Sequence, residues 1–163
     1  MRKFVYDAVF VVMGALVMTA TAADVAHAEK QSRRVTGHIH FDAIERGPSC
    51  PSPVGNCWRE TYTGGIEGVG KTAVQRYTPS DPPNVLFINE DEIIHTNDGD
   101  ITAKISAAYD STSPDKQFAS LHVITGGTGR YVGASGWLQL TGVATNGALN
   151  AEADYAGMIV TNR

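Results

Sequence analysis

The chain has 163 residues, with 13 Lys and Arg against 17 Asp and Glu, which gives a formal net charge of −4 at pH 7. No basic excess is present, so the composition predicts no binding to nucleic acid. Hydrophobic residues make up 42%, enough for a packed core, which excludes a disordered chain. Charged residues are few at 18% and glycines are many at 17, so a single turn-rich β domain is favoured over a helical bundle.

The first 28 residues have the pattern of a cleaved secretory signal. A basic start at Arg2 and Lys3 precedes an apolar run over residues 8–18, and Ala26-His27-Ala28 supplies a small-x-small cleavage site. The apolar run is shorter than the ~20 residues that a membrane-spanning helix needs. We therefore expect a secreted or periplasmic protein, with residues 29–163 as its single domain and no membrane attachment after cleavage.

Cys50 and Cys57 lie in one Pro/Gly-rich segment, Cys50-Pro51-Ser52-Pro53-Val54-Gly55-Asn56-Cys57. In an oxidising compartment, two cysteines in one short loop predict a structural disulfide. A metal or redox role would need a tighter spacing or more ligands.

The rest of the chain consists of short alternating runs separated by Gly, Pro, Asn and Asp. The predicted strands are 35–44, 58–66, 70–78, 84–96, 100–109, 117–125, 136–145 and 148–160. Asn146-Gly147 and Asp98-Gly99 are dipeptides typical of two-residue hairpin turns. Eight strands in one small domain indicate an antiparallel barrel or a compact sandwich. If the barrel is closed, its interior is wide enough for side chains or one small ligand.

Five glycines fall within residues 124–136, in Ile124-Thr125-Gly126-Gly127-Thr128-Gly129-Arg130-Tyr131-Val132-Gly133-Ala134-Ser135-Gly136. A phosphate-binding loop is disfavoured, because a strand follows and the Lys-Ser/Thr pair of a P-loop is lacking. Glycines here suit a tight corner between two barrel strands.

This run resembles the corresponding turn of the plant allene oxide cyclases and, less closely, that of the dirigent proteins. The matching residues are Gly126, Gly127, Thr128, Gly129, Tyr131, Gly133 and Gly136, followed by Leu138 and Leu140. The resemblance implies a bacterial-type exported member of this group: an eight-stranded antiparallel barrel, trimeric or dimeric, whose lumen holds a small apolar or phenolic molecule. It implies no cofactor and no metal.

A second similarity lies in the first strand. Aligning Arg46-Gly47-Pro48-Ser49 with the Arg-Gly-Ser-Pro loop of the cyclases places His40 and Asp42 on the acid and Asn positions of that family. A histidine cannot replace an acid electrostatically at neutral pH, so the fold carries over better than the reaction.

In Thr36-Gly37-His38-Ile39-His40-Phe41-Asp42, the side chains of His38, His40 and Asp42 share one face of the strand. Three interpretations remain open: a solvated outer face, a polar patch inside the lumen, or a metal site completed by another ligand. The lumen interpretation makes His40 and Asp42 catalytic, with His38 assisting.

Other candidate ligand-binding residues are Arg76, His122 and Tyr155, although a packed core tyrosine is the commoner case. Glu90, Asp91 and Glu92 are expected to form a solvated hairpin arm. No Ser/His/Asp spacing indicates nucleophilic catalysis, but such triads are recognised in space. We expect either a lumen enzyme that guides a cofactor-free cyclisation or isomerisation, or a carrier or scaffold that only binds.

Overall fold

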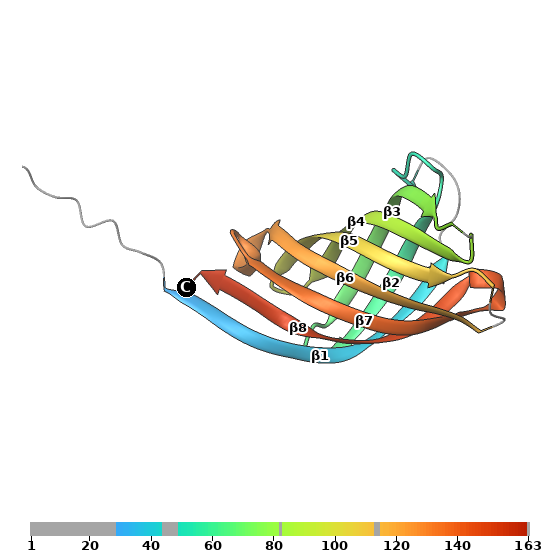
Figure 1. Cartoon of the computed structure of the whole chain (residues 1–163). Helices are drawn as coiled ribbons and strands as arrows, with labels where there is room; N and C mark the ends of the chain where they lie inside the picture. Colours follow the sequence, from blue (N-terminus) through green and yellow to red (C-terminus); the bar gives the residue numbers. More distant parts are fainter. Residues whose placement is uncertain (1–28, 44–48, 82, 113–114, 163) are drawn as a thin grey trace, which may run out of the picture.

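Eight antiparallel strands close into a barrel in the computed structural model, which describes residues 29–43, 49–81, 83–112 and 115–162 (Figure 1). The strands are β1 Lys30–Ala43, β2 Cys57–Gly64, β3 Gly68–Pro79, β4 Val85–Thr96, β5 Gly99–Asp110, β6 Lys116–Gly127, β7 Ser135–Thr145 and β8 Asn150–Asn162. Each strand pairs with its neighbours in sequence, and β1 pairs with β8. The predicted eight-stranded antiparallel barrel is confirmed, and the sandwich is excluded. The predicted signal, residues 1–28, lies outside the described residues.

One predicted turn is wrong. Residues 146–149 separate β7 from β8, and three of them form a 3-10 turn, η2 Asn146–Ala148, in place of a two-residue hairpin. Asn146 and Ala148 both have positive φ, at 52° and 66°. Between β4 and β5 the loop has two residues, but these are Asn97 and Asp98, because Gly99 already pairs with Thr96.

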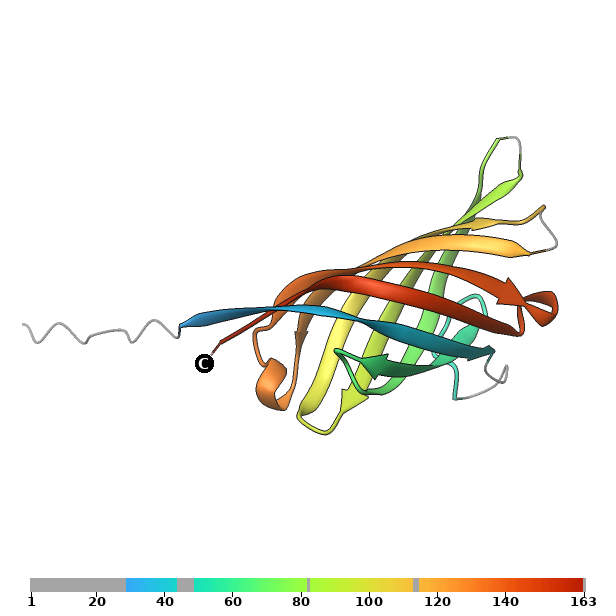
Figure 2. The same ribbon diagram turned by 90° about the horizontal axis from the view of Figure 1, so that it is seen from below.

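The connections of the barrel fall into two groups, one at each end (Figure 2). At one end lie the β2–β3, β4–β5 and β6–β7 connections, together with the start of β1 and the end of β8. The glycine-rich run makes the β6–β7 corner and contains the 3-10 turn η1 Gly129–Tyr131, as expected. The opposite end carries the β1–β2, β3–β4, β5–β6 and β7–β8 connections.

The interior near the β6–β7 corner is filled with apolar side chains. Tyr131 of η1 is 5% exposed and packs in the same cluster as Val35, Ile66, Ile124 and Ile159. This packing closes the corner end, so that any space for a ligand must lie toward the other end.

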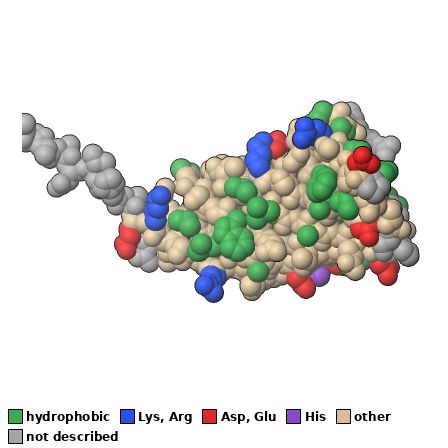
Figure 3. All heavy atoms as spheres, in the orientation of Figure 1, with side chains coloured by type: hydrophobic (Ala, Val, Ile, Leu, Met, Phe, Trp, Pro, Cys, Tyr) green, Lys and Arg blue, Asp and Glu red, His purple; other side chains and the backbone are tan. Residues whose placement is uncertain are grey.

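On the outer face of β6 and β7, apolar side chains are exposed to solvent (Figure 3). Val123 pairs directly with Trp137, and Leu121 lies one step along the same face of β6. The self-association implied by the resemblance stays a prediction, and this strip is the surface to probe for it. No helix within the described residues is long and apolar enough to cross a membrane.

Candidate functional site

The polar face of β1 points away from the barrel interior. Ile39 and Phe41 are 0% and 9% exposed, whereas His38 and Asp42 are exposed and about 42% of the His40 side chain is accessible. A closed barrel must fill its interior, and the apolar residues of a strand are the ones that do so. The expectation that His38, His40 and Asp42 lie in the lumen is therefore wrong. Of the other alignment positions, residues 46–48 lie outside the described residues.

These outward residues form an ionic cluster with β8. His38 donates from Nε2 to Glu152 at 2.7 Å and from Nδ1 to Asp154 at 3.0 Å. His40 donates from Nδ1 to Glu152 at 2.5 Å and from Nε2 to Asp42 at 3.2 Å. Because both nitrogens of each ring meet a carboxylate, the doubly protonated imidazolium is favoured.

The pKa values in this cluster follow from those hydrogen bonds. The bonds to Asp154 and Glu152 raise the pKa of His38, and the bond to Glu152 raises that of His40. Partial burial works to raise the pKa of Glu152, but the two imidazoles outweigh it and lower that pKa. Among the described residues, no group of three or more His, Cys, Asp and Glu side chains is arranged to hold a metal ion. The solvated outer face is thus the interpretation that the geometry favours.

Arg76 and Tyr155 also lie away from any ligand space. Arg76 is exposed next to an irregularity in the β3–β4 pairing. Tyr155 is 3% exposed near the corner end, where its hydroxyl accepts the Ile66 N–H at 2.7 Å and lies 3.2 Å from the Thr63 carbonyl oxygen. Burial raises the pKa of Tyr155. Both residues were predicted to bind ligand, but Arg76 is exposed on the outside of the barrel and Tyr155 packs in the apolar core near the corner end.

A cavity of about 640 Å³ opens at the end opposite the glycine-rich corner. Its wall is mostly aromatic and aliphatic, from Phe41, Trp58, Leu86, Ile88, Ile105, Tyr109 and Phe118. Four polar side chains join this lining deeper in the barrel: Glu60, Glu90, Ser120 and His122. Of the residues predicted to be catalytic or ligand-binding, His122 is the one that the structure places in the cavity wall.

A layer of buried polar side chains separates the cavity from the apolar packing at the corner end. Glu92 accepts hydrogen bonds from the Tyr62 hydroxyl and, at 2.8 Å, from His122 Nδ1. His122 Nε2 lies 3.1 Å from Ser120 Oγ. Glu60 accepts a hydrogen bond from Thr72, and its Oε2 has no hydrogen-bond partner. All of these side chains, including that of Tyr62, are at most 8% exposed.

Three carboxyl groups, those of Glu60, Glu90 and Glu92, share this interior with the imidazole of His122. Burial, followed by repulsion from Glu92, raises the pKa of Glu60 well above its ordinary value. Burial also raises the pKa of Glu90 to about 7, although His122 opposes the shift. Low-dielectric surroundings disfavour several like charges, so the interior relieves the repulsion by keeping protons on Glu60 and, in part, on Glu90. A titratable acid near neutral pH consequently borders the cavity.

Gly70 makes room for one of these acids. A Cβ at this position would lie 2.2 Å from Glu60 Oε2. Gly70 is the β3 residue paired with Glu60, so the absent side chain leaves the space that the carboxyl group occupies.

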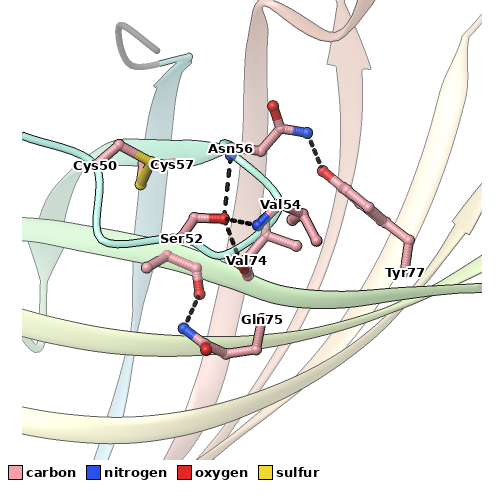
Figure 4. The surroundings of a disulfide bond; sticks show 9 residues. Cys50, Ser52, Val54, Asn56, Cys57, Val74, Gln75 and Tyr77 are labelled. Atoms are coloured by element: carbon pink, nitrogen blue, oxygen red, sulfur yellow. Dashed lines mark hydrogen bonds between the residues drawn. A yellow bond between two sulfur atoms is a disulfide. The ribbon is translucent and has the colours of Figure 1, made fainter. Parts of the chain in front are cut away.

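The predicted disulfide joins Cys50 and Cys57 with a Cα–Cα distance of 5.7 Å (Figure 4). Ser52 holds the loop to β3, because its hydroxyl donates to the Val74 carbonyl at 2.5 Å and accepts the Asn56 N–H at 3.1 Å. Asn56 also donates to the Tyr77 hydroxyl at 2.5 Å. Asn56, Cys57 and Tyr77 line the cavity, so the cross-linked loop forms part of its wall.

The acids of β4 are the functional candidates that sequence reasoning missed. Asp91 points outward and contacts Lys104 at 2.7 Å, as a solvated arm would, but Glu92 is 2% exposed and Glu90 lines the cavity. The sequence did contain a signal that these acids face the interior, because the aliphatic residues Leu86, Ile88 and Ile94 lie on the same face of the strand. A face with three aliphatic side chains is an interior face of the strand.

No family model matches the sequence, and no curated protein matches it. Among solved structures, the chain is similar to the pterocarpan synthase dirigent protein GePTS1 at 17% sequence identity and a TM-score of 0.47. That similarity covers 94% of this chain and 98% of the other. The resemblance to allene oxide cyclases stays a prediction.

Proposed function

We propose that this barrel is an exported protein that binds a small, mostly apolar, oxygenated molecule in its cavity and guides a cofactor-free isomerisation or cyclisation of it. The observation that carries this proposal is the cavity itself: about 640 Å³, with an aromatic and aliphatic wall and a few polar groups at its base. Cavities of roughly 300–1,000 Å³ with this lining are typical of small-molecule sites. The polar groups would meet the oxygen atoms of the ligand.

Glu90 is the residue that we assign to proton transfer. With a pKa of about 7, both its acid and its carboxylate are populated near neutral pH, so it can donate and accept a proton. An enclosed wall also holds the ligand in one conformation, which lowers the entropic cost of a ring closure. His40 and Asp42, which lie outside the barrel, take no part.

Export is supported by the leader pattern of residues 1–28 and by the cysteine pair. A Cys50–Cys57 disulfide is the form that cysteines take in oxidising compartments. A secreted or periplasmic location would also supply the ligand from outside the cytoplasm.

The proposal is tested by filling the cavity with a larger side chain and measuring ligand binding. The full chain, expressed with its leader, would be titrated with the apolar dye N-phenyl-1-naphthylamine, while retained small molecules are sought by solvent extraction and mass spectrometry. Ala107 lines the cavity, so we expect Ala107→Trp to weaken dye binding at least tenfold. Ala156 is exposed on the outer face of β8, and Ala156→Trp is the matched control that should bind like the parent. Ala107→Leu serves if the larger residue prevents folding.

Binding and turnover are then separated with Glu90→Gln. General acid–base catalysis contributes about 10²–10⁴-fold, so this variant should lose at least a hundredfold in turnover of any ligand that the screen finds, while retaining dye binding. If both folded Ala107 variants bind dye like the parent, the cavity is not the binding site. If binding holds but no ligand is converted, the protein is the carrier or scaffold that forms the alternative.

A further inference from the structure

Three side chains at the base of the cavity form a continuous hydrogen-bonded chain. Ser120 Oγ lies 3.1 Å from His122 Nε2, and His122 Nδ1 lies 2.8 Å from Glu92 Oε2. Ser120 and His122 both line the cavity, whereas Glu92 is buried behind them. The order is hydroxyl, imidazole, carboxylate, with the hydroxyl facing the ligand space.

Strand geometry explains how residues so far apart in sequence meet. Ser120 and His122 are two residues apart on β6, so their side chains leave the same face of the strand. Glu92 comes from β4, and β5 lies between the two strands. The β5 residue paired with Glu92 is Ala103, whose methyl group leaves room for the carboxylate and the imidazole to meet above it.

The hydrogen bonds also set the tautomer of His122. Glu92 accepts the N–H of Nδ1, which leaves the lone pair of the neutral ring on Nε2, where it faces the Ser120 hydroxyl. The Tyr62 hydroxyl holds the other oxygen of Glu92, so the carboxylate is fixed on both sides. A nucleophilic serine needs this tautomer and this orientation.

We propose that Ser120 is a nucleophile toward small, mostly apolar carboxylic esters, with His122 as its general base and Glu92 as the residue that positions His122. The proposal names a reaction different from isomerisation and rests on the proposed function only in that the cavity admits the ester.

In the first step, Ser120 Oγ bonds to the ester carbonyl carbon while its proton moves to His122 Nε2. The carbon–oxygen bond to the alcohol then breaks, and that proton leaves with the alcohol. Water attacks the acyl-serine with His122 again taking a proton, which returns to Ser120 Oγ as the carboxylic acid departs. No oxidant or reductant enters, and water is the sole co-reactant.

Tyr109 is placed to stabilise the oxyanion of this reaction. Its hydroxyl is buried without a hydrogen-bond partner, and the residue lines the cavity. On β5 it lies two residues beyond Ala107, the residue paired with Ser120. Backbone amides of β6 are committed to pairing with β5 and β7, so a side-chain donor is required, and a free phenol is one.

The test uses the purified full chain, p-nitrophenyl butyrate as the ester and diisopropyl fluorophosphate as the active-serine probe. We expect saturable release of p-nitrophenol, and one phosphoryl adduct that peptide mapping assigns to Ser120. Ser120→Ala should abolish the adduct and lower hydrolysis at least a hundredfold. Ser106 is exposed on the outer face of β5, and Ser106→Ala is the matched control that should match the parent.

Glu92→Gln tests the positioning role through the pH profile. Loss of the carboxylate partner should lower the rate and move the acid limb of the profile to lower pH, whereas a purely structural role would change the rate equally at every pH. The proposal is overturned if the parent neither hydrolyses the ester nor takes up the probe, or if Ser120→Ala behaves like the parent. Dye binding by the parent separates this failure from that of the cavity: if the parent binds the dye but is not acylated, the nucleophile alone is refuted.

Discussion

Replacing Glu90 with glutamine should stabilise the barrel in a manner that depends on pH. Burial raises the pKa of Glu90 from its ordinary 4.5 to about 7, so the folded protein holds a proton that the unfolded chain has released between these values. The favourable contribution of this protonation is complete below pH 4.5 and is lost as pH rises through about 7. Above pH 8 the parent therefore carries a partly buried carboxylate, repelled by Glu92, that Glu90→Gln lacks.

The magnitude follows from the same two values. At 1.36 kcal/mol per pH unit, a pKa moved from 4.5 to about 7 corresponds to about 3 kcal/mol. Glu90 is only partly buried and water can enter the cavity, so screening reduces the difference, and we expect about 1–3 kcal/mol. Glu90→Gln should equal the parent near pH 4 and exceed it by this amount at pH 8.5.

Urea unfolding at pH 4, 5.5, 7 and 8.5 measures the difference without adding the salt that screens charges. Glu67 is exposed in the β2–β3 connection, and Glu67→Gln is the control that should show no such trend. A free-energy difference between Glu90→Gln and the parent that stays constant with pH, or that shrinks above pH 7, would refute the reasoning about the interior acids.

Three further predictions concern residues outside the interior acids. Replacing both cysteines, Cys50→Ser with Cys57→Ser, should lower the free energy of unfolding in urea by about 2–3 kcal/mol, because the disulfide closes a short loop. The parent in reductant should lose the same amount, and equal stability with and without the disulfide would contradict this prediction. Gly136→Ala should lower the free energy of unfolding by about 2 kcal/mol or more, because φ is 141° and a Cβ would lie 2.0 Å from the Met158 carbonyl oxygen. Gly55→Ala, where φ is 76° and a Cβ would meet no atom within 4 Å, should lower it by about 1 kcal/mol. If thermal unfolding shows Gly55→Ala to be the more destabilising variant, this reasoning is wrong. His40→Ala and Asp42→Asn should leave dye binding unchanged and alter stability by less than about 1 kcal/mol, since their ion pairs are exposed; a changed dye affinity would return these residues to the site.

The strands were predictable because alternation is a local property. β5 and β6 begin and end within two residues of the ranges expected from the sequence, since the turn residues between them interrupt a period of two. The β7–β8 connection was not predictable in this way. Asn146 has the positive φ that the Asn-Gly signal implies, but Ala148 also has a positive φ. The connection is therefore longer than two residues, and the Leu149 N–H donates to the Asn146 carbonyl oxygen within it.

The side of each strand was harder to assign than its position. In β1 the apolar residues Ile39 and Phe41 indicated the interior face, but an alignment to a loop motif favoured His40 instead. A shift of one residue in such an alignment turns every side chain to the other face, so motif similarity is weak evidence for orientation. The apolar members of the strand decide the matter, because a closed barrel has to fill its lumen.

The triad-like chain could not have been found from spacing at all. Ser120 and His122 are close in sequence, but Glu92 reaches them only across β5, once the three strands β4, β5 and β6 have been placed in register. The hydrogen bonds depend on the register of β4 with β5 and of β5 with β6, which the spacing of residues along the chain does not give.

The buried acids bear on function because they do not serve stability. Apolar side chains of similar volume at positions 60, 92 and 122 would make the barrel more stable than Glu60, Glu92 and His122 do. The interactions of buried charged groups seldom offset the free energy needed to remove those groups from water. The barrel instead supports Glu60 with Thr72 and the space at Gly70, and Glu92 with Tyr62 and His122. Supporting contacts of this kind hold a costly group in one orientation, which is what a reactive site requires. That the costly layer lies at the base of the cavity, and the apolar packing at the closed end, is the reason to seek chemistry in the lumen and not on the histidine face of β1.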